Sequence, residues 1–196
     1  CALPICTGNV LYADTDVVFL KPVEPIFAAV RRGELYMHVM EDVVSRRANP
    51  ILAKLDTHLR DNTPMLVAGK PLWDLAMWNA GVLGFNTLHR LVLEDVLAFT
   101  DTEYIKFPKH VVEQFAFSVY FRQAGHIKAA APTILHYWNL KEVRPLLASF
   151  IQQFHTRCWE DIVTYSEMIQ MHVLMQEKLN FYSNIDIAGK LLKKHW

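Results

Sequence analysis

The sequence lacks the segments that mark membrane-spanning or secreted chains. No apolar run approaches the roughly 18 residues that a membrane-spanning helix needs, no basic segment precedes an apolar leader-like stretch, and no Asn-x-Ser/Thr sequon occurs. Cysteine is scarce as well: Cys1, Cys6 and Cys158 are an odd number, with neither metal-site spacing nor a disulfide framework. These absences predict a chain without a transmembrane segment and favour a reducing, cytoplasmic location.

An excess of charge of either sign is also missing. The chain has 20 basic and 20 acidic residues among 196, so its formal net charge is zero. Because a broad electrostatic surface is not implied, we expect no nucleic-acid partner. Hydrophobic residues make up 52% of the sequence, which is enough for a core, and the length fits one domain better than two.

Strand and helix patterns alternate over the first two-thirds of the chain. Short apolar or β-branched runs at 10–13, 17–20, 34–41 and 78–86 predict strands, and segment 126–138 predicts a strand pair broken at Pro132. Apolar residues at helical spacing predict helices from about Pro50 to Leu59, after Asn86, and before Gly125. The alternation predicts an α/β fold with a mixed, mainly parallel sheet.

From Asn139 onward the pattern is helical only. Amphipathic segments occupy LKEVRPLLASFIQQFH and the long run that begins at Cys158. No repeat, low-complexity tract or linker marks an internal boundary. We therefore predict a core over residues 1–138 and a helical extension over residues 139–196 that packs on the core.

Two carboxylates interrupt the first apolar run, in the stretch NVLYADTDVVFLKPVEPIF. On an extended backbone, Asp14 and Asp16 point to the same side, with Cα atoms about 6.5–7 Å apart. Burying both without a cation would cost several kcal/mol or neutralise one of them. The apolar flanks therefore favour a divalent ion, Mg²⁺ or Mn²⁺. The alternative is a turn in which one aspartate caps the backbone and the other faces solvent.

Four segments together resemble GT-A-fold glycosyltransferases. VLYADTDVVFLKP resembles their metal-binding strand end, WNAGVLGFN their N-A-G segment beside the donor sugar, VVEQFAFS their segment with an acidic residue and Gln, and ILHYWNLKE their late metal-ligand histidine. In that family the nucleobase and ribose are held by residues before the acidic pair, where this sequence has only thirteen. The resemblance thus implies either a longer parent enzyme that contains the N-terminal nucleotide-binding part or a nucleotide pocket that is built differently.

The resemblance also implies roles for individual residues. Asp14 and Asp16 would hold the metal against the diphosphate, and His136 would complete the metal shell as a neutral imidazole, which suits Mn²⁺ better than Mg²⁺. The other implied roles are donor-sugar contact, neutralisation of the leaving diphosphate, and catalysis at the reacting sugar. They fall on Asn79, Ala80 and Gly81 for the sugar, on Lys141 for the diphosphate, and on Glu113 and Gln114 for catalysis.

Each of these residues also has an ordinary structural explanation when it is taken singly. His136 fits a core histidine, the N-A-G segment fits a strand-entry turn, and Lys141 fits a solvent-facing lysine. Glu113 fits the first turn of a helix, where the helix dipole favours a carboxylate. The order and number of the segments, more than any one residue, favour the functional interpretation.

The resulting prediction is a metal-dependent glycosyltransferase that moves a sugar from a nucleoside-diphosphate sugar, with a UDP-sugar favoured, to a glycan, lipid or protein acceptor. The segment order resembles the retaining families more than the inverting ones, in which Glu113 would act as the base. Two alternatives stay open. One is a nucleotidyltransferase, which also uses paired aspartates, and the other is a non-catalytic glycosyltransferase-like remnant that acts as an interaction module.

Overall fold

The structure is a computed structural model that describes residues 8–63, 65–138, 143–158 and 160–162. The chain divides into two compact units, residues 1–136 and 137–196. The first unit contains all the described strands. Its helices and strands confirm the predicted mixed α/β class.

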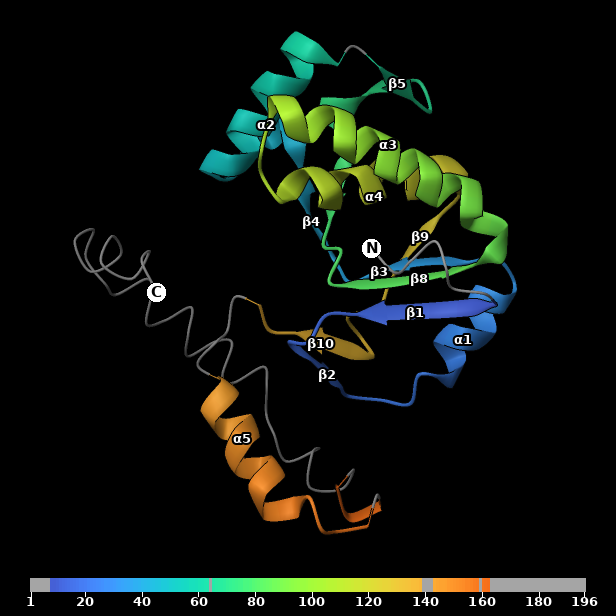
Figure 1. Cartoon of the computed structure of the whole chain (residues 1–196), viewed down its shortest axis with the longest axis vertical. Coiled ribbons are helices and arrows are strands. Elements are labelled where there is room, and N and C mark those ends of the chain that lie inside the picture. Colours follow the sequence, from blue (N-terminus) through green and yellow to red (C-terminus); the bar gives the residue numbers. More distant parts are fainter. Residues whose placement is uncertain (1–7, 64, 139–142, 159, 163–196) are drawn as a thin grey trace, which may run out of the picture. The chain divides into compact units, whose positions relative to one another are not determined.

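A four-stranded sheet lies at the centre of the first unit (Figure 1). Its strand order is β1 (Asn9–Ala13), β8 (Val82–Asn86), β3 (Leu35–Met37) and β9 (Ile127–Ala129). The expectation of a mainly parallel sheet is wrong for these strands, because β8 runs antiparallel to both β1 and β3 and only β3 and β9 are parallel. The alternation of strands and helices had favoured parallel pairing, whereas here β8 enters the sheet between two strands that run the other way.

Helices cover both faces of this sheet. Helix α1 (Glu24–Arg31) packs on one face, where Ile26 and Val30 meet Val82 of β8. The other face carries the larger core, with α2 (Pro50–Asn62), α3 (Arg90–Lys106) and α4 (Val111–Ala124), as Figure 1 shows. Residues alternate between the two cores along β8: Val82 contacts the α1 side, and Leu83 and Phe85 belong to the larger core.

The predicted strands 34–41 and 78–86 are each interrupted. The chain leaves the central sheet after β3 and enters β4 (Met40–Val43), and it passes from β7 (Ala76–Trp78) into β8. The backbones of the two breaks are hydrogen-bonded to each other, since His38 N donates to Asn79 O at 3.0 Å and Asn79 N donates to Val39 O at 2.8 Å. Both segments thus bend together at the same place, and β4 and β7 continue as a separate antiparallel pair.

The remaining elements of the first unit are short. Strand β2 (Val17–Phe19) pairs with β10 (Ile134–His136), and β5 (Leu66–Val67) pairs with β6 (Lys70–Pro71). The described residues also form the 3-10 turns η2 (Val44–Arg46), η3 (Leu72–Asp74) and η4 (Thr87–His89). The helix predicted from Pro50 is confirmed, and its start is capped by Asn49, whose side chain accepts from Ile51 N at 3.0 Å and from Leu52 N at 2.9 Å.

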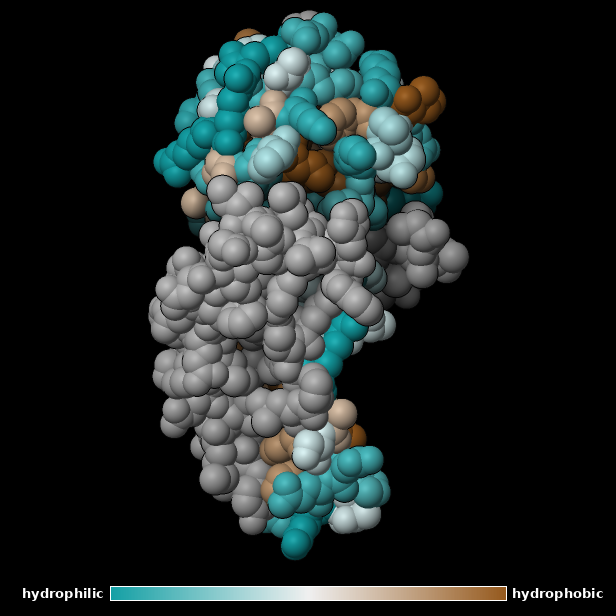
Figure 2. Space-filling model, turned by 90° about the vertical axis from the view of Figure 1, so that its left-hand side faces the viewer, coloured by the Kyte–Doolittle hydropathy of each residue, from teal (hydrophilic) through white to brown (hydrophobic). Residues whose placement is uncertain are grey.

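In the second unit the structure describes helix α5 (Val143–Phe154) and a short following segment. Lys141 and most of the helix predicted after Cys158 lie outside the described residues. Among the residues that are described, no helix is long and apolar enough to cross a membrane. On the face shown in Figure 2, hydrophilic residues predominate over the described surface, with a few hydrophobic ones between them.

Candidate metal centre

Two strand pairings place the acidic pair at the end of β1. Ala13, the last residue of β1, pairs with Val82, and Asp14 N donates to Gly81 O at 2.9 Å. Strand β2 then begins at Val17, which pairs with His136 of β10. Because the segment from Asp14 to Asp16 is held at both ends, the backbone brings residues 14–16 beside the histidine that lies 120 positions later.

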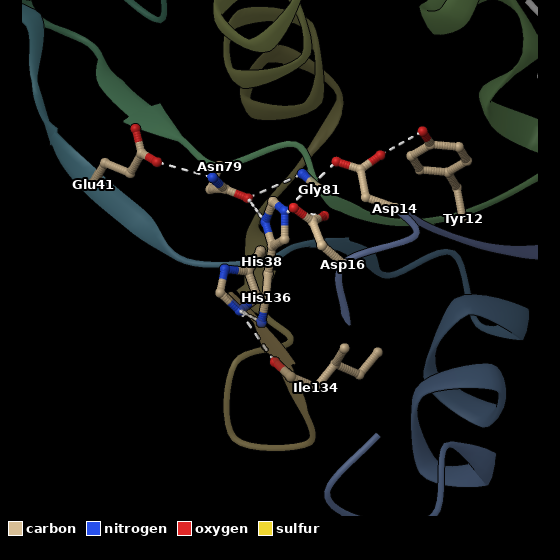
Figure 3. A network of polar contacts seen from close by, with 9 residues as sticks. All are labelled: Tyr12, Asp14, Asp16, His38, Glu41, Asn79, Gly81, Ile134 and His136. Carbon is tan, nitrogen blue, oxygen red and sulfur yellow. Dashed lines mark hydrogen bonds and ion pairs between the residues drawn. The ribbon is translucent and has the colours of Figure 1, made fainter. Parts of the chain in front are cut away.

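Asp14, Asp16 and His136 converge, as predicted (Figure 3). One ligand atom from each lies within 4.8 Å of the other two. His136 Nε2 is 3.0 Å from Asp16 Oδ1 and 3.6 Å from Asp14 Oδ2. The exposed fraction of the side chain is 5% for His136, 22% for Asp16 and 39% for Asp14. The site is therefore anchored in the protein on the histidine side and reached from solvent on the Asp14 side.

The other ring nitrogen of His136 contacts the side chain of Asn79, at an Nδ1 to Oδ1 distance of 2.8 Å. The orientation of the Asn79 amide is set by its other neighbours. Its Oδ1 also accepts from Gly81 N at 3.0 Å, and its Nδ2 donates to Glu41 Oε1 at 2.9 Å. Since Oδ1 is an acceptor only, the proton of this contact lies on His136 Nδ1.

A neutral His136 with its proton on Nδ1 presents a lone pair at Nε2, directly toward two carboxylates. That arrangement is unfavourable unless a cation lies between them or Nε2 also carries a proton. The two carboxylate oxygens and one imidazole nitrogen are a donor set that fits Mn²⁺. The structure therefore brings the three predicted ligands together in an arrangement that could hold a metal ion.

Gly81 is required at this site by space. A Cβ at residue 81 would lie 2.1 Å from His136 Cε1 and 2.2 Å from His136 Nδ1. Side chains larger than hydrogen are excluded because the imidazole ring rests against the glycine backbone. The N-A-G segment thus contributes Asn79 to orient the ring and Gly81 to make room for it.

Tyr12 and His38 surround the three ligands. Tyr12 donates from its hydroxyl to Asp14 Oδ1 at 2.6 Å, and this hydrogen bond, with burial and the charges of Asp14, Glu113 and Asp16, raises the pKa of Tyr12 to about 12. The ring of His38 meets that of His136 edge-on, with centroids 5.4 Å apart. Burial, followed by the electrostatic influence of His136, lowers the pKa of His38, which favours the neutral form of its ring beside the site.

The predicted catalytic pair lies on the first turn of α4. Glu113 is exposed, and its charge contributes to the raised pKa of Tyr12. Gln114 donates from Nε2 to Glu41 Oε2 at 2.9 Å. The same Glu41 accepts from Asn79, so the two predicted segments are joined through a carboxylate that was not among the predicted site residues.

The structure adds Glu41 to the predicted site and shows that Asn79 is buried against His136. Glu41 ends the run ELYMHVME, where we expected one continuous strand, and only its place as an acidic residue at a strand end hinted at a role. Asn79 is 4% exposed, and its amide oxygen is engaged by Gly81 and His136. Ala80 is half-buried beside it and packs against the larger core.

Comparison of the chain with protein-family models, with curated proteins and with solved structures finds no match.

Proposed function

We propose that the first unit is the metal-binding part of a GT-A-type glycosyltransferase, which moves a sugar from a nucleoside diphosphate, with UDP favoured, to an acceptor. The observation that carries the proposal is the convergence of Asp14, Asp16 and His136 at the end of β1. Asp14 and Asp16 lie in the turn between β1 and β2, whereas His136 ends β10, 120 positions after Asp16. The predicted family roles require all three residues at one place.

The donor set and its surroundings support Mn²⁺ as the cofactor, with Mg²⁺ as the alternative. Asp14 and Asp16 supply oxygen ligands and His136 supplies a nitrogen, which Mn²⁺ accepts more readily than Mg²⁺ does. When bound, Mn²⁺ supplies Lewis-acid stabilisation of the charge that develops on a leaving diphosphate. Tyr12 orients Asp14 through its hydroxyl, and the exposed side of Asp14 leaves the site open to a phosphate-bearing ligand.

The reacting sugar is proposed to lie against the first turn of α4. Gln114 is fixed there by Glu41, and Glu113 adds an exposed carboxylate. In a retaining transferase these residues would line the donor face, whereas in an inverting one Glu113 would take the proton of the acceptor hydroxyl. We favour retention, on the resemblance of the segment order.

A metal and nucleotide titration tests the proposal. Thermal melts of the protein, with and without Mn²⁺ and UDP, should show a higher midpoint with Mn²⁺ and a further rise with both. Hydrolysis of a panel of nucleotide sugars with Mn²⁺ then identifies the donor, and NMR of the released or transferred sugar gives the anomeric configuration. A well-folded sample whose midpoint responds to neither ligand would favour the non-catalytic interaction module instead. An inverted product would remove the preference for retention.

A further inference from the structure

We propose that Glu41 and Asn79 are positioning residues, which hold the His136 ring with its proton on Nδ1 and its Nε2 toward Asp14 and Asp16. Neither residue is itself a ligand in this proposal. It rests on the proposed function only for the identity of the cation that Nε2 would bind. The chain of contacts runs from Gln114 through Glu41 and Asn79 to the histidine, and Figure 3 shows its last two links.

Each link in this chain has only one consistent direction. Glu41 is a carboxylate and accepts at both oxygens, from Gln114 Nε2 and from Asn79 Nδ2, each at 2.9 Å. Asn79 therefore turns its oxygen away from Glu41, and that oxygen accepts from Gly81 N and from His136 Nδ1. Turning the Asn79 amide over would set its NH₂ group against Gly81 N–H and its oxygen against the Glu41 carboxylate.

Protein-bound metals commonly depend on such outer contacts. A histidine ligand usually donates its second N–H to an oxygen, which fixes the ring orientation and the tautomer. In this chain the oxygen belongs to Asn79, and Glu41 anchors Asn79 from the solvent side. Glu41 thus reaches the ligand His136 through one intervening residue, without facing the cation.

Four variants separate a hydrogen-bonded chain from a simple effect of nearby charge. Glu41→Ala removes the anchor, whereas Glu41→Gln removes the charge but keeps a carbonyl that accepts from Asn79, because the half-buried Gln114 can turn its amide to match. Glu113→Gln removes a charge that acts on Tyr12 and lies outside the chain. Asn79→Ala removes the acceptor of the His136 proton.

The first readout is the dissociation constant of Mn²⁺ alone, measured by electron paramagnetic resonance. We expect Glu41→Ala to weaken Mn²⁺ binding by about 10- to 100-fold, and Glu41→Gln to weaken it no more than Glu113→Gln does. Equal losses in Glu41→Ala, Glu41→Gln and Glu113→Gln would mean that only charge matters and would overturn the proposal. Glu41 is exposed, so its variants are expected to fold even where the buried Asn79→Ala does not.

The second readout needs no metal and follows the tautomer itself. Long-range ¹H–¹⁵N spectra recorded at the high-pH end of a titration should show the proton of His136 on Nδ1 in the wild type and in Glu41→Gln. Glu41→Ala should shift the population toward the form protonated on Nε2. A purely structural role would lower stability and leave the tautomer unchanged, which would overturn the proposal. If the wild type binds no Mn²⁺ but keeps the Nδ1 proton, the proposed function fails and the positioning role stands.

Discussion

Replacing Asp16 with asparagine distinguishes a cation site from an acidic residue that serves only the fold. Asp16 Oδ1 lies 3.0 Å from His136 Nε2, and the Asp16 side chain is 22% exposed. Asparagine keeps the shape, removes one negative charge beside Asp14, and offers an N–H to the Nε2 lone pair. We expect the metal-free Asp16→Asn protein to be as stable as the wild type, or more stable by up to about 1 kcal/mol, because a partly exposed ion pair contributes little.

The response to metal should differ much more. At a Mn²⁺ concentration of about 100 times the dissociation constant, binding stabilises the wild type by about 2.7 kcal/mol. For a chain of this length that corresponds to a rise of about 5–10 °C in Tm. If the loss of a ligand weakens Mn²⁺ binding by about 100-fold or more, the same concentration stabilises Asp16→Asn by no more than about 0.4 kcal/mol, or roughly 1 °C.

Paired thermal melts followed by circular dichroism measure both effects. Wild type and Asp16→Asn are melted with and without Mn²⁺ and UDP, beside the control Asp101→Asn. Asp101 is an exposed residue of α3, so the same substitution there should leave the response to Mn²⁺ intact. An Asp16→Asn protein that is destabilised by about 2 kcal/mol or more, yet responds fully to Mn²⁺, would refute the cation-site interpretation.

Two further substitutions test the site and the fold. Gly81→Ala should abolish Mn²⁺ binding in protein that is still folded by circular dichroism, because the new Cβ would overlap the His136 ring; retained binding contradicts this. Burial opposes ionisation of Asp56, but the hydrogen bonds and charges of Arg60 and Arg47 outweigh burial and lower the pKa of Asp56. The contribution of Asp56 to the free energy of unfolding is therefore present above its unfolded-state pKa and is lost as pH falls through its folded-state pKa. Urea melts should show that Asp56→Asn lowers the free energy of unfolding by about 1.5–3 kcal/mol at pH 7. Below about pH 4 the stability of the variant should depend less on pH than that of the wild type, and an unchanged pH dependence contradicts this.

The sequence was informative where a local pattern decides the structure. The helix from Pro50 has its cap at Asn49 and its apolar spacing within a few residues, and Gly125 directly follows α4, as expected. The acidic pair could also be recognised in the sequence, because two carboxylates between apolar runs are costly to bury without a cation. The association of Asp14 and Asp16 with His136, by contrast, came from the resemblance of separate segments and not from any local rule.

Other features depend on contacts that no local pattern encodes. The direction of β8 is set by its place between β1 and β3, so strand alternation alone gave the wrong prediction of a mainly parallel sheet. Helix α1 was not predicted, although Pro25 in its first turn is a typical start signal, because the apolar residues around it resemble a strand. Glu41 was missed because its partners Asn79 and Gln114 become neighbours only when the strand runs bend.

The acidic pair lies between two apolar strands, β1 and β2, whose backbone pairing brings the site residues together. The pairing of Ala13 with Val82 sets Asp14 beside Gly81, and the pairing of Val17 with His136 sets the histidine beside Asp16. In the β2–β10 pair, a shift of β10 by one residue would turn the buried Ile134 toward solvent, so Ile134 helps to fix the register that places His136 beside Asp16. A cation bound between the carboxylates and the imidazole would in turn join the central sheet to the β2–β10 pair. Metal binding and the local folding of this corner are therefore expected to be coupled.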